Sequence, residues 1–417
     1  MSQAPSPEAD DSRSLLARRP YALFLAGRFC GTLATGSQSV VIGWEVYETA
    51  RETMSVAEAS FVVGMIGLAQ FLPLFALTLL AGEAADRHDR RRILALCYLT
   101  QLLTAVALAL RSEFGSGLWP IFALAALFGS ARAFFQPAAS ALGPMLVPLR
   151  LLPRAIATNS LAAQLASILG PAVGGLLCAA SPALGYVVSA ALYATSAVCV
   201  LLIRADARPH VEPGRSRAAQ IREGLGYVWG NKLVLGAISL DLFAVLLGGA
   251  TGLLPVFARD VLHVGPEGFG VLRAAPAVGA LVVAAYLSVR PVRTRAGVKM
   301  LVAVGLFGLM TVVFAYSRWL PLSVVALAVL GGADMVSVFT RQSLVQIATP
   351  DRMRGRVSAV STLFIGASNE LGEFESGVVA RVLGPVGAVA FGGFAAIGVT
   401  ALWAWLFPPL RQADRLV

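Results

Sequence analysis

Four acidic side chains lie inside segments of the sequence that are otherwise apolar. Glu370 and Glu373 are three residues apart in STLFIGASNELGEFESGVVA, so a helix would place both on one face. Paired carboxylates in a medium of low dielectric repel each other, which allows one of them to take up a proton near neutral pH. Asp334 and Asp241 each stand alone in another apolar segment. We predict that these four acids carry protons, because no histidine falls inside an apolar segment.

Arginines also lie in apolar segments, where they could form ion pairs with these acids. Arg132 lies near the middle of an apolar segment, and Arg341 follows Asp334 by seven residues on nearly the same helical face. An ionised side chain at the centre of a bilayer costs about 2.5–3.5 kcal/mol even on insertion scales, so each of these residues is a candidate functional residue. The alternative is that the acids form static ion pairs with Arg132, Arg28 or Arg341.

Other polar side chains within the apolar segments indicate a substrate cavity. Amides without hydrogen-bond partners are costly in lipid, and an aromatic residue could pack against an apolar ligand. The predicted cavity residues are Arg132, Gln38, Phe135, Gln136, Asn159, Gln164 and Asn369. Glu45 and Glu375 lie near the outer ends of their segments, where we expect water to solvate them. The four cysteines occur singly in apolar segments, so the sequence indicates neither a disulfide framework nor a metal site.

The elements that must position these residues are membrane-spanning helices. Of the 417 residues, 57% are hydrophobic and 13% are charged, against roughly 25% charged in a soluble domain. Apolar stretches of about 18 or more residues predict transmembrane helices, since backbone groups in lipid must be satisfied within helices or closed barrels. Twelve such helices are expected, at 21–47, 56–81, 93–111, 117–142, 155–180, 183–203, 233–258, 267–289, 297–317, 319–345, 356–380 and 384–407. The fold class is therefore an all-α membrane protein.

The distribution of positive charge predicts the topology. Most of the 33 Lys and Arg residues fall on one side of the twelve-helix map, as the positive-inside rule requires for the cytoplasmic side. We therefore expect both termini in the cytoplasm, with residues 1–20 as a disordered tail that does not look like a cleaved signal and 409–417 as a second tail. The formal net charge of +10 is then a consequence of topology, and no nucleic-acid partner is expected.

The chain is expected to consist of two related halves. The longest cytosolic loop, 204–232, separates a six-helix bundle at 21–203 from a second at 233–408. Segments of the two halves match at an offset of 202 residues: Gly129-Ser130-Ala131 aligns with Gly331-Gly332-Ala333, and Pro148, Arg150 and Arg154 align with Pro350, Arg352 and Arg356. Internal repeats of this kind are typical of secondary transporters, whose substrate path lies between the halves.

Two motifs make the chain resemble the major facilitator superfamily. The loop between the second and third helices reads Gly82-x-x-x-Asp86-Arg87-x-x-Arg90-Arg91, which is similar to the cytosolic loop of that superfamily, with Asp89 where the pattern prefers glycine. Gly170-Pro171-x-x-Gly174-Gly175 in the fifth helix resembles the element associated with antiporters of this superfamily, and Arg132 lies where such antiporters often carry a buried arginine. TPDRMRGRV from Thr349 and TARETMSVAEASFVVG resemble the branch of enterobactin exporters.

The resemblance assigns structural roles to both motifs. It implies that Asp86 interacts with the positive end of the eleventh helix near Arg356, forming a cytosolic latch that favours the outward-open state. The remaining latch residues are Gly82, Arg87, Arg90 and Arg91, the arginines either tying helices together or anchoring anionic lipid headgroups. Gly170, Pro171, Gly174 and Gly175 would form a bent, closely packed hinge, although small-residue packing alone would explain the same residues.

The expected function is export across a bacterial inner membrane. Two bundles would rock about a central cavity and move a small organic molecule, such as a siderophore, drug or metabolite, in exchange for protons. The alternatives are a proton-coupled uptake permease with the same fold and a lysophospholipid flippase. An enzyme is not expected, because the sequence contains no His/Cys metal cluster, nucleophile motif or phosphate loop. The expected partners are the substrate, protons and membrane lipids. We expect no cofactor, because the proton gradient supplies the energy. The resemblance to the superfamily, whose members are commonly monomers, implies a monomer.

Overall fold

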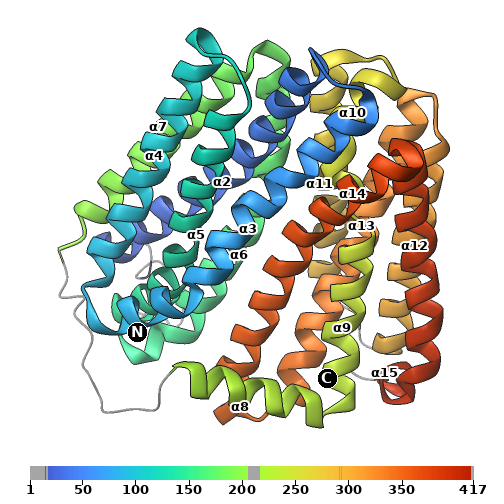
Figure 1. Cartoon of the computed structure of the whole chain (residues 1–417). Coiled ribbons are helices and arrows are strands. Elements are labelled where there is room, and N and C mark those ends of the chain that lie inside the picture. Colours follow the sequence, from blue (N-terminus) through green and yellow to red (C-terminus); the bar gives the residue numbers. More distant parts are fainter. Residues whose placement is uncertain (1–14, 16, 205–216, 291, 293, 415–417) are drawn as a thin grey trace, which may run out of the picture.

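The protein is helical almost throughout the part that the computed structural model describes, which is residues 15, 17–204, 217–290, 292 and 294–414 (Figure 1). The long helices are α2 (Arg19–Arg51), α3 (Val56–Arg87), α4 (Arg90–Phe114), α5 (Trp119–Met145), α6 (Leu152–Ala180), α7 (Pro182–Leu201), α8 (Arg217–Gly230), α9 (Lys232–Leu247), α11 (Gly265–Val289), α12 (Ala296–Tyr316), α13 (Leu320–Ala348) and α14 (Asp351–Leu406). Short elements are η1 (Leu149–Leu151), η2 (Ala250–Leu253), α10 (Leu254–Val256), η3 (Phe257–Val261) and α15 (Pro408–Gln412). Most of the tail expected at 1–20 lies outside the described residues, as do 415–417.

These helices account for the expected membrane spans. Among the described residues, ten helices are long and apolar enough to cross a membrane. One of them, α14, holds two of the expected spans, because Gly384 adopts a left-handed conformation (φ 73°) that interrupts the helical backbone. The span at the start of the chain corresponds to α2, a helix of 33 residues whose apolar character is diluted by Arg28, Gln38 and Glu45. The protein is therefore an all-α, multi-pass membrane protein.

The long helices form two bundles. Helices α2–α7 make one bundle and α9–α14 the other, while α8 lies across their base, at the bottom of Figure 1. Both marked chain ends lie at this same end of the molecule. We call it the linker end and the opposite one the far end; the charge distribution predicts that the linker end faces the cytoplasm.

The apolar core joins the two bundles at the far end. One cluster of buried residues combines Tyr47 and Ile121 of the first bundle with Phe257, Phe314 and Val389 of the second. Two further clusters each belong to a single bundle, one drawing on residues 15–203 and the other on 228–413. Within the described chain, apolar packing between the halves is thus concentrated at the far end.

Glycines allow the bundles to cross closely. A Cβ atom at Gly64 of α3 would lie 2.8 Å from the Cα atom of Gly377 of α14, and one at Gly175 of α6 would lie 2.8 Å from the Cβ atom of Arg273 of α11. Helices α3 with α14, and α6 with α11, therefore form the two main contacts between the halves.

The seventh expected span, 233–258, is not one continuous helix. Helix α9 ends at Leu247, and the chain continues through η2, α10 and η3, a π-helix, to Val261. The break falls at Gly248–Gly249, where a Cβ atom on Gly249 would lie 2.5 Å from the carbonyl oxygen of Gly372 on α14. Interrupted helices in transporters lie where unwound backbone lines a binding site. The run LLGGATGLLP is the sequence signal that could have predicted this break.

Candidate functional site

An ion pair joins the two halves in the middle of the molecule. The guanidinium of Arg132, on α5, lies 2.7 Å from a carboxylate oxygen of Glu370, on α14. The same guanidinium donates a hydrogen bond of 3.2 Å to the side-chain oxygen of Gln70 on α3 and lies over the ring of Phe128, 5.7 Å from its centroid. The side chains are 25% and 11% exposed, so little solvent screens the pair. Breaking a pair of this kind leaves an uncompensated charge in a poorly solvated place.

A second carboxylate lies beside this pair. Glu373 makes no hydrogen bond or ion pair with any described residue, but it interacts electrostatically with Glu370, Arg273 and Arg132. Glu373 and Arg273 line a cavity of about 30 Å³ between the halves, together with Gln70. The guanidinium of Arg273 donates to the carbonyl oxygen of Thr251 at 3.0 Å. The interrupted seventh span therefore supplies a backbone acceptor at the site.

A separate group of charges lies inside the second bundle. The carboxylate of Asp241, on α9, is 3.3 Å from the guanidinium of Arg341, on α13, and both side chains are buried. Asp334 interacts electrostatically with both residues but forms no hydrogen bond or ion pair within the described chain. The structure thus divides the four predicted proton carriers into two pairs, each containing one acid bonded to an arginine and one acid that is not.

The predicted cavity residues do not all share one surface. Asn369 and Gln136 are exposed, whereas Asn159 and Gln164 are half-buried. Phe135 packs edge-on against Tyr98, with 5.5 Å between the ring centroids. Gln38 is fully buried and its amide donates to the hydroxyl of Thr104 at 3.5 Å, so it packs within the first bundle and does not line the cavity beside Glu373.

The four residues of the predicted hinge form contacts on two sides of α6. A Cβ atom at Gly174 would lie 2.7 Å from the Cα atom of Ser37, and Pro171 lies against Gly36. Both contacts are with α2, in the same half. Gly170 also faces α2, whereas Gly175 faces Gly270 and Arg273 of α11, in the other half. Helix α6 continues through Pro171 without interruption.

The contacts that the structure describes for the predicted latch residues are the following. Arg356 pairs with Glu223 on α8, and Arg87 forms an ion pair of 2.8 Å with Glu83 one helical turn away. Arg91 bonds to the carbonyl oxygen of Ile203. The guanidinium of Arg90 donates to the carbonyl oxygen of Ala85 at 3.2 Å. The remaining latch residues are Gly82 and Asp86, and the side chain of Asp86 lies outside the described part of the structure.

Asp89, where the superfamily pattern prefers glycine, has a local structural role. Its carboxylate accepts a hydrogen bond of 2.9 Å from the backbone N–H of Arg91 and caps the N-terminus of α4. A side-chain acceptor at this position satisfies one of the N–H groups that a helix leaves unpaired at its start.

Ion pairs also join the halves at the far end, and sequence reasoning did not find them. Asp260 lies 3.0 Å from Arg51 and accepts a hydrogen bond from the hydroxyl of Tyr47. Arg259 lies 3.0 Å from Glu48. The residues come from the end of α2 and from η3, which the interrupted span brings together. Nothing in the sequence spacing indicates that contact, because the two segments are about 210 residues apart.

The prediction that Glu45 is solvated is wrong. Glu45 is 5% exposed, lies 2.7 Å from the guanidinium of Arg111 and accepts a hydrogen bond of 2.6 Å from the hydroxyl of Tyr186. Helices α4 and α7 bring these two partners to α2, so the carboxylate is satisfied inside the first bundle. Glu375 is half-buried, with only a 3.5 Å hydrogen bond from Ser376.

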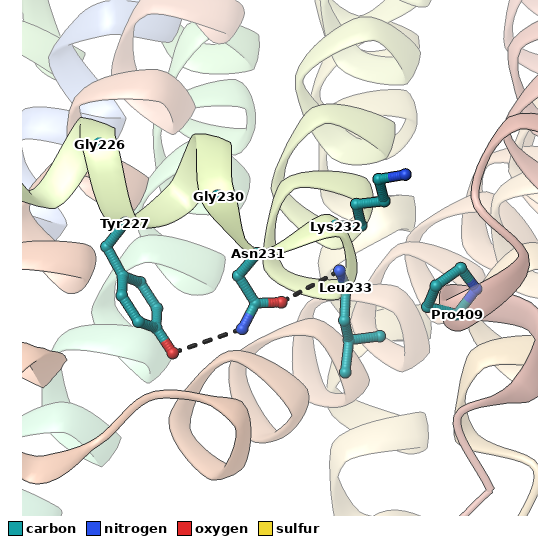
Figure 2. Close-up of a pocket in the computed structure, with 7 residues that line it drawn as sticks. All are labelled: Gly226, Tyr227, Gly230, Asn231, Lys232, Leu233 and Pro409. Carbon is teal, nitrogen blue, oxygen red and sulfur yellow. Dashed lines mark hydrogen bonds between the residues drawn. The ribbon is translucent and has the colours of Figure 1, made fainter.

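A larger hollow lies at the linker end, away from the charged site. It has a volume of about 640 Å³ and runs between the end of α8, the start of α9 and Pro409. Figure 2 shows the side chain of Asn231 there, hydrogen-bonded to the hydroxyl of Tyr227 and to the backbone N–H of Leu233. None of the predicted site residues lines this hollow.

Comparison with known proteins identifies relatives along nearly the whole chain. The family described as transmembrane secretion effector matches residues 18–416. The multidrug efflux pump Tap of Mycobacterium tuberculosis is 29% identical over 415 residues, covering 95% of each chain. The enterobactin exporter EntS of Escherichia coli is 27% identical over 409 residues, covering 96% of this chain and 94% of the relative.

Solved structures share the fold at low sequence identity. A bacterial homologue of the human lysosomal transporter Spinster, in an inward-facing conformation, gives a TM-score of 0.70 with 14% identity over 94% of this chain and 96% of the other. A D-xylose–proton symporter gives a TM-score of 0.70 with 12% identity over 95% of this chain and 99% of the other.

Proposed function

Given that the chain belongs to the transmembrane secretion effector family of the major facilitator superfamily, we propose that it exports a small organic molecule across the bacterial inner membrane in exchange for protons. Like its relatives, the protein is a transporter and not an enzyme. Export is favoured over uptake because both of the relatives compared above are named as an efflux pump or an exporter. In this proposal the linker end and both termini face the cytoplasm.

The observation that carries the coupling proposal is the bonding of Arg132 to Glu370 across the halves, with Glu373 beside them. Protonation of Glu373 removes one of two neighbouring negative charges, so that Glu370 alone holds Arg132. Loss of that proton restores the repulsion between the two carboxylates of α14 and adds a second negative charge that attracts Arg132 of α5. The proton thereby alters the same contact that must rearrange when the halves rock.

The second pair, Asp334 and Asp241, offers a parallel proton site inside the second bundle. Arg341 is shared between the two acids, so only one of them is neutralised by a bonded cation. Asp334 is the acid that is free to take up the proton. We propose that Asp334 and Glu373 are the principal carriers and that Asp241 and Glu370 hold the arginines.

Transport in everted membrane vesicles tests this function. The substrate is first found by comparing growth inhibition and secreted metabolites of a deletion strain with those of its parent. An acid-inside gradient should then drive that compound into vesicles that contain the protein. Glu373→Gln and Asp334→Asn should abolish the gradient-driven accumulation while leaving substrate–substrate exchange intact, because exchange needs no net proton movement.

Glu375→Gln is the matched control, since it removes a carboxylate two residues away on the same helix. It should transport normally. Normal gradient-driven accumulation by both Glu373→Gln and Asp334→Asn would refute the coupling proposal. Uptake into right-side-out vesicles driven by inward proton movement would instead indicate a permease, and movement of lysophospholipid between leaflets without a proton gradient would indicate a flippase.

A further inference from the structure

Arg28, on α2, has no acceptor for its charge. Its guanidinium carries five N–H donors, yet it forms no hydrogen bond or ion pair with any described residue. The Nε atom is buried without a partner, and the side chain as a whole is half-buried. An uncompensated arginine within a membrane-spanning helix is costly, so a residue of this kind needs a partner that arrives from elsewhere.

The surroundings of Arg28 cannot supply that partner. The hydroxyls of Tyr21 and Tyr98 lie near enough to interact electrostatically with it. Both hydroxyls already donate to backbone carbonyl oxygens, Tyr21 to Ala155 at 2.7 Å and Tyr98 to Gly27 at 3.1 Å. A phenol accepts a hydrogen bond but brings no negative charge.

Among the acids whose side chains the structure describes, none in the first bundle neutralises Arg28. Glu45, the acid buried within these helices, is bonded to Arg111 and Tyr186 near the far end. In the second bundle, Glu370 pairs with Arg132 and Asp241 with Arg341, while Glu373 and Asp334 do not act on Arg28, whose electrostatic neighbours are Tyr98 and Tyr21. The positive charge of Arg28 is therefore unmatched among the described residues.

Aromatic side chains lie between Arg28 and the central ion pair, and two of them, Tyr98 and Tyr193, are buried within the first bundle. Tyr98 interacts with Arg28 on one side and with Tyr193 on the other, and Tyr193 interacts with Arg132. Phe135 packs edge-on against Tyr98. The first bundle thus holds two arginines with aromatic side chains between them, of which Phe135 is half-buried and Tyr98 and Tyr193 are buried.

We propose that Arg28 binds the anionic group of the transported molecule, and that the substrates are organic anions with an apolar or aromatic body. The proposal rests on the proposed transport function and adds the class of substrate. The guanidinium would bind a carboxylate or similar group by donating two parallel hydrogen bonds to it, while the body of the ligand packs against the half-buried ring of Phe135. The anion would satisfy the donors that Arg28 now leaves unpaired.

Binding to the purified full chain tests the proposal without any proton gradient, so its outcome is independent of the coupling. The protein is placed in nanodiscs of zwitterionic phosphatidylcholine, and its unfolding temperature is followed against salicylate, tetraphenylphosphonium and inorganic phosphate. Ligands that bind the folded state raise this temperature in a dose-dependent way. Salicylate should do so in the unmodified protein, and tetraphenylphosphonium should not.

Variants of Arg28 separate the proposed site from a general effect. Arg28→Gln should weaken the apparent affinity for salicylate by about tenfold or more, because a charge-assisted hydrogen bond is lost. Arg28→Lys should retain part of the affinity. Arg381→Gln, which removes an arginine stacked over Phe61 and lowers the net charge equally, should bind like the unmodified protein. Without any ligand, Arg28→Gln should unfold at the same temperature as the unmodified protein or higher, because an unpaired charge has been removed.

Several results would overturn the proposal. These are equal stabilisation of Arg28→Gln by salicylate, no stabilisation of the unmodified protein up to the solubility limit of salicylate, or stabilisation by tetraphenylphosphonium alone. Arg28-dependent stabilisation by inorganic phosphate but not salicylate would assign the site to a free inorganic anion. Arg28-dependent stabilisation by phosphatidylglycerol in the disc, without salicylate, would assign it to a lipid headgroup.

Discussion

At the scale of single residues, charge pairing distinguishes the two types of acid in the membrane-spanning helices. Glu370 and Asp241 are each bonded to an arginine, while Glu373 and Asp334 are not bonded to one. The sequence located all four, because a carboxylate in an apolar helix is conspicuous. It could not say which would be paired, since Arg132 and Glu370 are 238 residues apart. Proton carrying and static pairing, which the sequence left as alternatives, therefore fall to different residues in our proposal.

Removing Arg132 should destabilise the protein more than removing the whole pair. Arg132→Gln leaves Glu370 without its cation, so we expect the free energy of unfolding to fall by roughly 3–5 kcal/mol. Adding Glu370→Gln should restore a substantial part of that loss, because no buried charge then lacks a partner. The unfolding temperatures of the two single variants and the double variant in detergent measure this coupling. Additive losses would show that the two residues do not depend on each other.

At the scale of helices, the observed boundaries agree with those expected from the apolar pattern to within a few residues for most helices. They depart from it where the backbones of two helices come into contact. Helix α4 covers Arg90–Phe114 where 93–111 was expected, and α13 covers Leu320–Ala348 where 319–345 was expected. The interruption after α9 was missed, because hydropathy registers neither the glycines of the run LLGGATGLLP nor the carbonyl oxygen of Gly372 against which Gly249 packs. Such breaks depend on contacts between distant segments, and the hydropathy of one segment carries no information about those contacts.

A methyl group at Gly249 should disturb the junction between α9 and α14. A Cβ atom there would meet the carbonyl oxygen of Gly372 and the hydroxyl of Ser376 at 2.5 Å, so Gly249→Ala should cost about 1–3 kcal/mol of stability and reduce transport. Gly366→Ala on α14 is the control, because a Cβ atom at Gly366 meets nothing within 4 Å. We expect that variant to be unchanged or more stable by up to about 1 kcal/mol. Equal unfolding temperatures for both variants would contradict the steric argument.

At the scale of the whole molecule, the halves are closed at the far end by apolar packing and by ion pairs. The sequence predicted two bundles from the internal repeat and the central loop, but the conformation could not be inferred from it. The loop motif predicts a latch at the linker end, which would favour the outward-open state. In the structure, Arg356 bonds to Glu223 of α8, and the cross-bundle ion pairs of Asp260 and Arg259 lie at the far end.

Weakening the far-end contacts should shift the population toward the outward-open state. Asp260→Asn removes the charge that binds Arg51 while keeping the size of the side chain. In a background with the four native cysteines replaced, spin labels at Glu52 and His263 should then report a larger share of long distances between the bundles than in the parent. Glu58→Gln, which alters a capping residue of α3 within one bundle, should leave that distribution unchanged. Identical distributions for Asp260→Asn and its parent would show that apolar packing alone closes this end.

The pairing of Arg132 with Glu370 also bears on how membrane voltage acts on the transport cycle. A potential of 100 mV does about 2.3 kcal/mol of work on each elementary charge that crosses the full bilayer. Two opposite charges held 2.7 Å apart move together as a neutral dipole, so displacing this pair contributes almost nothing to that work. The electrical cost of a cycle is then set by the charges of the cargo and of the exchanged protons. An anion leaving as a proton enters would carry current in one direction, and a negative cell interior would assist both movements.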